Sequence, residues 1–209
     1  MKLITDKLQN GLKNPMFTEY LQTPTPITKF TKEEIDQLQS TLESAIKTYP
    51  GLGIAAPQLG IKKRVCLLNV RDNVLFLVNP VITHRSEDNF LFYEGCLSIP
   101  KTQNNFICTI RSTEIKVQTD NLGEIEFKIN PDGDKEQVSD ETLLTVVAQH
   151  EIDHLDGITI QNRVYSTTIV KNTKYGRNEK VLMKSPTGEF VEVKYKKANE
   201  YFINGYEIV

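Results

Sequence analysis

The residues best suited by type and spacing to metal binding and catalysis form the segment His150-Glu151-Ile152-Asp153-His154. On an α-helix, side chains four positions apart lie on one face, so both imidazoles can reach a single metal ion. Glu151 is not needed as a ligand and would lie beside the metal, where it can take a proton from water. The spacing predicts a hydrolytic metal site, against the simpler alternative of two histidines in ordinary hydrogen bonds.

Two histidines leave the coordination shell incomplete, because a catalytic metal of this type takes about three protein ligands and keeps one open position. The metzincin pattern would supply a third histidine at the position of Ile160, so that pattern fails. A glutamate from a second helix is not expected, because Glu179, Glu189 and Glu192 lie in a strand-like tail. His84 lies in a polar Thr-His-Arg-Ser segment, which is typical of an exposed turn.

The three cysteines differ in their surroundings. Cys66 and Cys108 lie in apolar segments, where a small buried side chain is the natural interpretation. Cys96 instead lies between Gly95 and Leu97, at the end of an expected strand. Glycine permits unusual backbone geometry, so this thiolate can turn toward the helix. We therefore favour Cys96 over its rivals as a soft ligand in a mixed sulfur and nitrogen site.

An apolar face accompanies the histidines on the same predicted helix. Leu143, Val146 and Val147 precede His150 by seven, four and three positions and so share its face. They would form either an apolar wall beside the metal or a plain part of the core.

Three segments in this order resemble the peptide deformylase family: residues 51–58 (GLGIAAPQ), 94–98 (EGCLS) and 149–155 (QHEIDHL). The similar region covers roughly residues 5–165. The resemblance implies that Cys96, His150 and His154 bind the metal and that Glu151 is the acid and base. It also implies that Gln58 and the backbone N–H of Leu97 stabilise the oxyanion.

The resemblance further places Gly53 where the peptide substrate pairs as an added strand, and places Leu52 and Phe92 opposite the apolar wall. The expected substrate-binding residues are Leu52, Gly53, Phe92, Glu94, Gly95, Leu143, Val146 and Val147.

The implied reaction removes the formyl group from the N-terminal formylmethionine of nascent polypeptides and releases formate. One divalent metal ion per chain is implied, with Fe²⁺ favoured and Zn²⁺, Ni²⁺ or Co²⁺ as alternatives. Two other functions are open: a general metalloprotease, which Ile160 weakens, and a catalytically silent peptide-binding module, which the intact Glu151 argues against.

The chain departs from the family pattern in two places. Many members carry an arginine shortly after the cysteine motif, but residues 101–105 contain none, and Arg111 lies further along. Bacterial relatives often end in a basic helix associated with ribosome docking. From about Lys174 this chain instead reads as strands with a short helix, so the tail does not support ribosome association.

The surrounding elements must position these residues. Thr31 and Glu34 form a capping-box pattern at the start of a helix that Pro50 and Gly51 end. A second helix is expected over residues 139–156, with Gly157 as its stop. Strands are expected at 65–70, 74–78, 90–93, 114–119 and 124–129, whereas prolines make residues 1–30 irregular.

This order indicates an α+β fold in which antiparallel strands pack around a central metal-binding helix. We expect a catalytic domain at residues 1–170 and a small strand-rich extension at 171–209. In the extension, strands at 181–184 and 190–195 flank a turn, and a short helix at 198–204 precedes a strand at 206–209.

Composition excludes several classes. The chain has 209 residues, 39% of them hydrophobic, and a net charge of −2. It has no apolar run long enough for a membrane span and too few cysteines for a disulfide scaffold. Near-neutral charge gives no sign of a nucleic-acid site. The N-terminal segment lacks the apolar core of a signal peptide, so a cytoplasmic location is expected.

Overall fold

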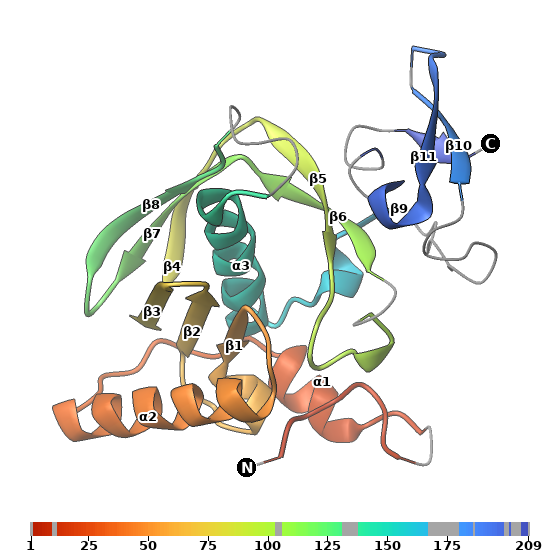
Figure 1. The fold of residues 1–209 in the computed structure, drawn as a ribbon. Helices are drawn as coiled ribbons and strands as arrows, with labels where there is room; N and C mark the ends of the chain where they lie inside the picture. The colour runs from red at the N-terminus through yellow and green to blue at the C-terminus, as the bar shows by residue number, and fades with distance from the viewer. Residues whose placement is uncertain are drawn as a thin grey trace.

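The computed structural model describes residues 2–9, 12–102, 106–130, 138–166, 180–185, 187–198, 201 and 206–208. It has an α+β fold (Figure 1). The helices are α1 (Pro15–Leu21), α2 (Lys32–Thr48) and α3 (Asp140–Leu155). The strands are β1 (Gly53–Ala55), β2 (Val65–Val70), β3 (Asn73–Val78), β4 (Val81–Arg85), β5 (Asn89–Glu94), β6 (Ile107–Ser112), β7 (Glu114–Thr119), β8 (Gly123–Lys128), β9 (Val164–Ser166), β10 (Lys180–Lys184), β11 (Phe190–Lys194) and β12 (Glu207–Ile208).

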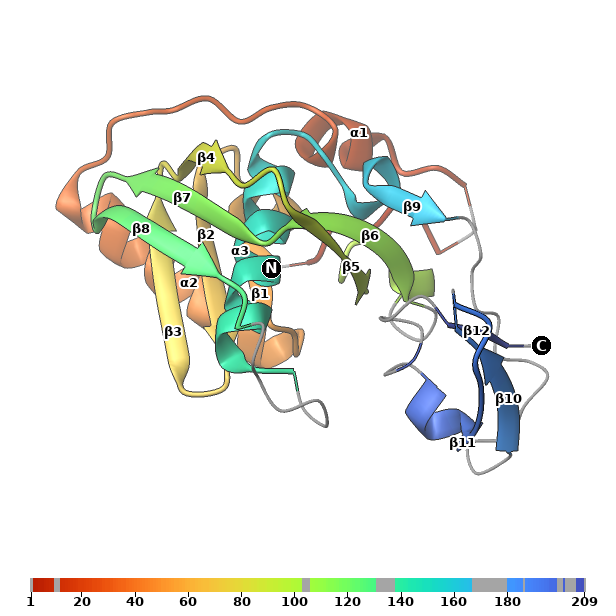
Figure 2. The ribbon, with the colours of Figure 1, turned by 90° about the horizontal axis from the view of Figure 1, so that it is seen from above.

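The described strands form four three-stranded sheets, in the orders β1-β2-β3, β4-β7-β8, β5-β6-β9 and β11-β10-β12. All of their pairings are antiparallel. Figures 1 and 2 show α3 enclosed by the first three of these sheets. The expectation of antiparallel strands around one late helix is therefore confirmed.

The two long helices begin where their capping residues predict. Thr31 accepts a hydrogen bond from the backbone N–H of Glu34, and the Glu34 carboxylate accepts one from the N–H of Thr31. Ser139 caps α3 by accepting from the N–H of Thr142. Gly157, with φ of 72°, follows the end of α3 in the left-handed conformation that glycine tolerates best. Local chemistry therefore fixes both ends of the helix that carries the histidines.

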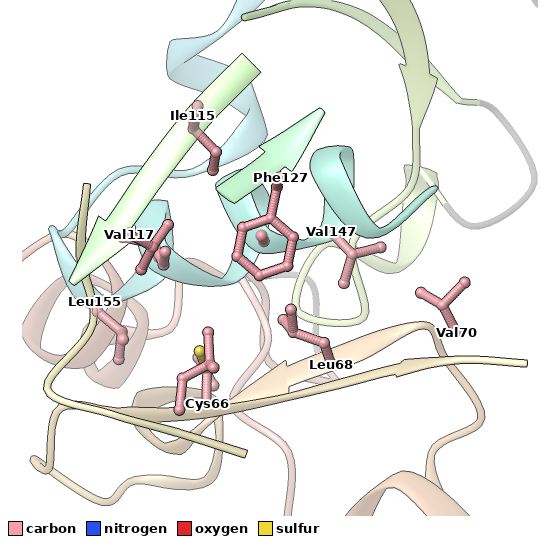
Figure 3. Packing of buried hydrophobic residues seen from close by; sticks show 12 residues of the cluster. Cys66, Leu68, Val70, Ile115, Val117, Phe127, Val147 and Leu155 are labelled. Atoms are coloured by element: carbon pink, nitrogen blue, oxygen red, sulfur yellow. The ribbon is translucent and has the colours of Figure 1, made fainter. Parts of the chain in front are cut away.

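The core lies on both faces of the sheet β1-β2-β3, because α2 covers one face and α3 the other. Leu67 and Phe76 pack against α2. Cys66 and Leu68 belong to the cluster shared with α3 and the sheet β4-β7-β8 (Figure 3). Burial on both faces explains why β2 is a continuous apolar run rather than an alternating one. Cys66 is fully buried, as its sequence context predicts.

The structure differs from the expectations in three places. Residues 15–21 are not irregular, because Pro15 lies in the first helical turn, where its fixed φ favours α1 and its missing N–H costs nothing. Residues 53–59, for which the sequence predicted no helix or strand, form β1 followed by a 3-10 helix at Ala56–Leu59. His84 is exposed, as expected, but it lies in β4 rather than in a turn.

The C-terminal strands form a small unit with its own buried cluster of Val181, Met183, Val193 and Ala198. The pairing of β10 with β11 confirms the predicted hairpin, and β12 confirms the terminal strand. The predicted helix at 198–204 lies mostly outside the described residues. Figure 2 shows this sheet to one side of the rest of the chain. Among the described helices, none is both long and apolar enough to cross a membrane.

Candidate active site

One thiol and two imidazoles meet at the centre of the fold. The ligand atoms of Cys96, His150 and His154 all lie within 4.8 Å of one another, and all three residues are buried. Sγ of Cys96 lies 3.3 Å from Nε2 of His154. The two histidines occupy one face of α3, and Cys96 follows β5. A thiolate with two imidazoles is a donor set that suits zinc, iron and related divalent metals, so these residues fit such an ion.

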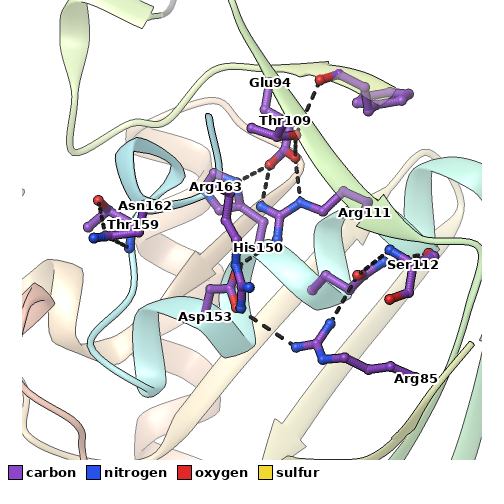
Figure 4. Close-up of polar contacts among 12 residues, drawn as sticks. Arg85, Glu94, Thr109, Arg111, Ser112, His150, Asp153, Thr159, Asn162 and Arg163 are labelled. Carbon is purple, nitrogen blue, oxygen red and sulfur yellow. Dashed lines mark hydrogen bonds and ion pairs between the residues drawn. The ribbon is translucent and has the colours of Figure 1, made fainter. Parts of the chain in front are cut away.

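A buried polar network contacts His150 at Nδ1, the ring nitrogen that faces away from the cluster. Its Nδ1 lies 2.7 Å from Oε2 of Glu94, which leaves Nε2 to face the other two donor groups. Arg111 donates to both carboxylate oxygens of Glu94, through Nε at 2.5 Å and Nη2 at 2.8 Å, and its Nη1 lies 2.6 Å from Oδ2 of Asp153 (Figure 4). Thr109 also donates to Glu94. Strands β5 and β6 are thereby tied to α3 by paired charges.

Burial and charge act in opposite directions in this network. Burial alone would raise the pKa of Glu94, but the guanidinium of Arg111 and the hydrogen bond with His150 lower it to about 2. Burial raises the pKa of Glu151 to about 7, against the attraction of His150. Burial lowers the pKa of His154 well below its usual value. For His150, the hydrogen bonds with Cys96 and Glu94 outweigh burial and raise its pKa.

Glu151 lies at the point where β1 crosses α3. Its Oε2 is buried and has no hydrogen-bond partner among the described residues. A Cβ built on Gly53 would lie 2.6 Å from Oε1 of Glu151 and 2.8 Å from Cγ1 of Val147. Only glycine allows the strand to approach the helix this closely. One carboxylate oxygen beside the cluster of Cys96, His150 and His154 therefore has no partner in the described part of the chain.

The side chain of Gln58 is held in a fixed orientation. Its Oε1 accepts a hydrogen bond from the N–H of Ala55 at 2.8 Å, and its Nε2 donates to Oγ of Ser98 at 3.1 Å. The acceptor is thus occupied, and an N–H is the group that can face a ligand. Both Gln58 and Leu97 line the cavity described next.

A cavity of about 480 Å³ opens beside these groups. It is lined by every residue that the sequence placed in the site except His154, which is fully buried. Leu143, Val146 and Val147 form one apolar side of it, as the helix spacing predicts. The lining also includes residues that sequence reasoning missed: Leu3, Thr48, Tyr49, Pro50, Gly51, Tyr93 and Phe106.

Sequence reasoning also missed the groups that support the site. Arg111 was set aside as too distant, yet it is 2% exposed and pairs with Glu94 and Asp153. Asp153 lies inside the histidine motif and received no role, although its i+4 spacing from Gln149 marks a second polar row on α3. Ser98 lies in the EGCLS segment and could have been noted there. Among residues 101–105, where a family arginine is absent, 103–105 lie outside the described part.

Comparison with known proteins gives one family. The sequence model described as polypeptide deformylase matches residues 16–169. A peptide deformylase of Acidobacterium capsulatum is 35% identical over 69% of this chain and 80% of its own length. One of Natranaerobius thermophilus is 37% identical over 61% of this chain and 77% of its own length. Among solved structures, a probable peptide deformylase from Synechococcus phage S-SSM7 aligns with a TM-score of 0.59 at 30% identity, covering 78% of this chain and 99% of that one.

These matches agree with the three ordered segments, the antiparallel fold and the cysteine and histidine cluster. The chain belongs to the polypeptide deformylase family, whose members are metal-dependent hydrolases that remove the formyl group from the N-termini of new polypeptides.

Proposed function

We propose that this chain deformylates N-formylmethionyl peptides with one divalent metal ion held by Cys96, His150 and His154. The observation that carries the proposal is their convergence within 4.8 Å beside Glu151, whose Oε2 has no partner among the described residues. The donor set is compatible with Fe²⁺, which the resemblance favours, and with Zn²⁺, Ni²⁺ or Co²⁺. Such a thiolate site with iron is expected to be sensitive to oxidation.

When bound, the metal would supply Lewis-acid chemistry, polarising the formyl carbonyl and making water acidic. Glu151 takes the proton of the attacking water and returns it to the departing amine. Its unpaired carboxylate oxygen supports this role, because that atom is free to hold the proton between the two steps. Formate leaves, and the peptide keeps a free amino terminus.

Gln58 and Leu97 are assigned to the negative charge that develops on the formyl oxygen. The contact of Ala55 with Oε1 of Gln58 supports this assignment, since the amide nitrogen is then the end that can donate into the cavity. A donor held in place before the reaction stabilises a developing oxyanion without reorganising. The N–H of Leu97 is the second donor in this proposal.

The methionine side chain is assigned to the apolar wall of Leu143, Val146 and Val147, with Leu52 and Phe92 opposite. Strand β1 pairs with β2 and lies at an edge of its sheet, which leaves Gly53 able to pair with an added peptide strand. Main-chain pairing tolerates many peptide sequences, as a nascent-chain enzyme requires. Gly95, which lines the same cavity, is also assigned to substrate binding.

Glu94 is assigned to positioning rather than to substrate contact. Its two oxygens are already engaged by Arg111 and His150, so it sets which nitrogen of His150 faces the metal.

The test combines metal analysis with an anaerobic assay of formate release from a formyl-Met peptide. Cys96→Ser is expected to lose metal and activity, whereas Cys108→Ser, the same change outside the cluster, keeps both. Glu151→Gln is expected to keep its metal and lose turnover. Full metal content in Cys96→Ser, or full activity in Glu151→Gln, would contradict the assignments.

We also propose that residues 1–170 are the catalytic unit and that 171–209 are an accessory extension of a cytoplasmic protein. The match of the family over residues 16–169 supports the boundary. A chain ending at residue 170 is expected to deformylate peptides as the full chain does. The extension offers no argument for ribosome association.

A further inference from the structure

A second cavity, of about 370 Å³, opens on a different face of α3 from the metal-binding cluster. Gln149 and Asp153 form one row along the helix, next to the row of His150 and His154. The lining residues come from β4, β5, β6, α3, β9 and the segment before β9. They are Arg85, Asn89, Ile110, Arg111, Ser112, Gln149, Asn162, Arg163 and Val164.

The guanidinium groups outnumber the carboxylates here. Arg111 is satisfied by Glu94 and Asp153. Arg163 donates to both oxygens of Asp153, through Nε at 3.0 Å and Nη2 at 2.7 Å. Arg85 is left with the same carboxylate as its only ion pair among the described residues, across 3.9 Å from Nη2 to Oδ1 (Figure 4).

The acidic group that follows the C-terminal end of α3 does not correct this imbalance. Oδ1 of Asp156 lies 2.7 Å from Nη2 of Arg64, so the charge of Asp156 is already balanced by that arginine. Burial lowers the pKa of the Arg85 guanidinium, and the attraction of Asp153 is opposed by Arg163 and Arg111. Among these described groups, one positive charge, that of the partly exposed Arg85, therefore remains in excess.

Neutral side chains hold the lining in place. Nη1 of Arg85 donates to Oε1 of Gln149 at 3.1 Å, and the same oxygen accepts from the N–H of Ser112 at 3.0 Å. Nε2 of Gln149 donates in turn to the carbonyl oxygen of Ser112. This hydrogen bond orients the side chain of Arg85 before a ligand binds. The side chain therefore loses less conformational entropy on binding.

We propose that this cavity binds a small organic oxyanion, a carboxylate or a phosphate monoester, whose oxygens lie between Arg85 and Arg163. Guanidinium groups match such anions with paired hydrogen bonds. The cavity volume falls in the range of small-molecule sites and exceeds what one oxyanion group fills, and Ile110 and Val164 provide apolar lining for the remainder. Deformylation does not require this ligand.

The test measures binding of two probes, sodium phosphate and sodium acetate, to the zinc-loaded full-length protein, against sodium chloride at equal ionic strength. Thermal unfolding and isothermal titration calorimetry are recorded for wild type and Arg85→Gln. The matched control is Lys32→Gln, which also removes one positive charge, from a side chain that is 85% exposed on α2.

Phosphate or acetate is expected to raise the Tm of wild type and of Lys32→Gln beyond the effect of chloride. Arg85→Gln is expected to weaken that binding at least about tenfold, the effect of losing a charged hydrogen bond. A phosphate response alone identifies the phosphate class, and an acetate response alone the carboxylate class. No response to either probe, or an equal response in Arg85→Gln, would overturn the proposal.

A measurement on wild type alone covers the case in which Arg85→Gln does not fold. In a nitrogen-15 NMR titration, the effective probe should shift the amide signals of Ser112 and Val164 and leave those of β3 unchanged. Amide-signal shifts confined to other segments would also contradict the proposed site. Deformylase activity is assayed separately on the same samples. A negative binding result would therefore contradict the anion site without contradicting the proposed reaction.

Discussion

Replacing Gly53 with alanine tests the close approach of β1 to α3. The added Cβ would lie 2.6 Å from Oε1 and 2.7 Å from Cγ of Glu151, and 2.8 Å from Cγ1 of Val147. Gly53 has an ordinary φ, so the effect of the substitution is steric and owes nothing to backbone strain. Overpacking of this kind costs about 1–3 kcal/mol of unfolding free energy.

The larger effect is expected on catalysis. Contacts this short cannot persist, so either the strand moves away from the helix or the Glu151 carboxylate moves. A displacement of about 1 Å in a reacting group can lower the rate by about 10²-fold. Such a loss corresponds to about 2.7 kcal/mol of activation free energy. We therefore expect Gly53→Ala to fold, to bind its metal and to lose about two orders of magnitude in kcat/KM.

The assay follows formate release from a formyl-Met peptide, with metal content and urea unfolding measured on the same preparation. Gly123→Ala is the matched control, because the same methyl group there meets no atom of the described residues within 4 Å. Gly123 is the first residue of β8, where the chain leaves the turn after β7. Its φ of 71° predicts a stability loss of about 1 kcal/mol with normal turnover. Wild-type kcat/KM in folded Gly53→Ala would refute the reasoning.

Three further changes address other parts of the site. Arg111→Met leaves Glu94 and Asp153 buried without their shared cation, and urea unfolding should show a loss of about 3–5 kcal/mol, whereas a loss below about 1 kcal/mol would contradict the pairing. Ser98→Ala removes the acceptor for Nε2 of Gln58, so kcat should fall by about tenfold while metal content is kept; an unchanged kcat would show that Gln58 needs no such support. Removing the metal with a chelator should lower Tm, and adding Zn²⁺ should restore it, because the ion binds the folded chain; a constant Tm in metal-free protein would argue against the cluster at Cys96.

The elements with local signals were predictable from the sequence. The capping box at Thr31, the histidine spacing of α3 and the apolar run of β2 each depend on residues near one another in the chain. Helix α1 was missed because a proline can end a helix or begin one, and its neighbours did not decide between these outcomes. Strand β1 was missed because its glycine serves a contact with α3, about 100 positions away.

In the site too, residues with a signal in the neighbouring sequence could be predicted, whereas residues whose role depends on distant contacts could not. Cys96 could be favoured from its neighbours, and residues such as Gln58 came from the family resemblance. The burial of Arg111 could not be foreseen, because an arginine in a strand is usually exposed and its partners Glu94 and Asp153 come from two other elements. Only the pairing of β5 with β6 and the packing of α3 bring these charges together.

The single carboxylate of Asp153 also bears on how the chain folds. It is contacted by Arg111 from β6, by Arg163 from the segment before β9 and, at longer range, by Arg85 from β4. Until α3 docks, Arg163 and Arg85 lack this counter-charge and Arg111 has only Glu94. If the strands cover α3 without these arginines in place, the carboxylate of Asp153 is buried unpaired. Partial assembly is therefore penalised from either side. Formation of this region is expected to be strongly cooperative, with α3 and the sheet around β6 becoming native in the same step.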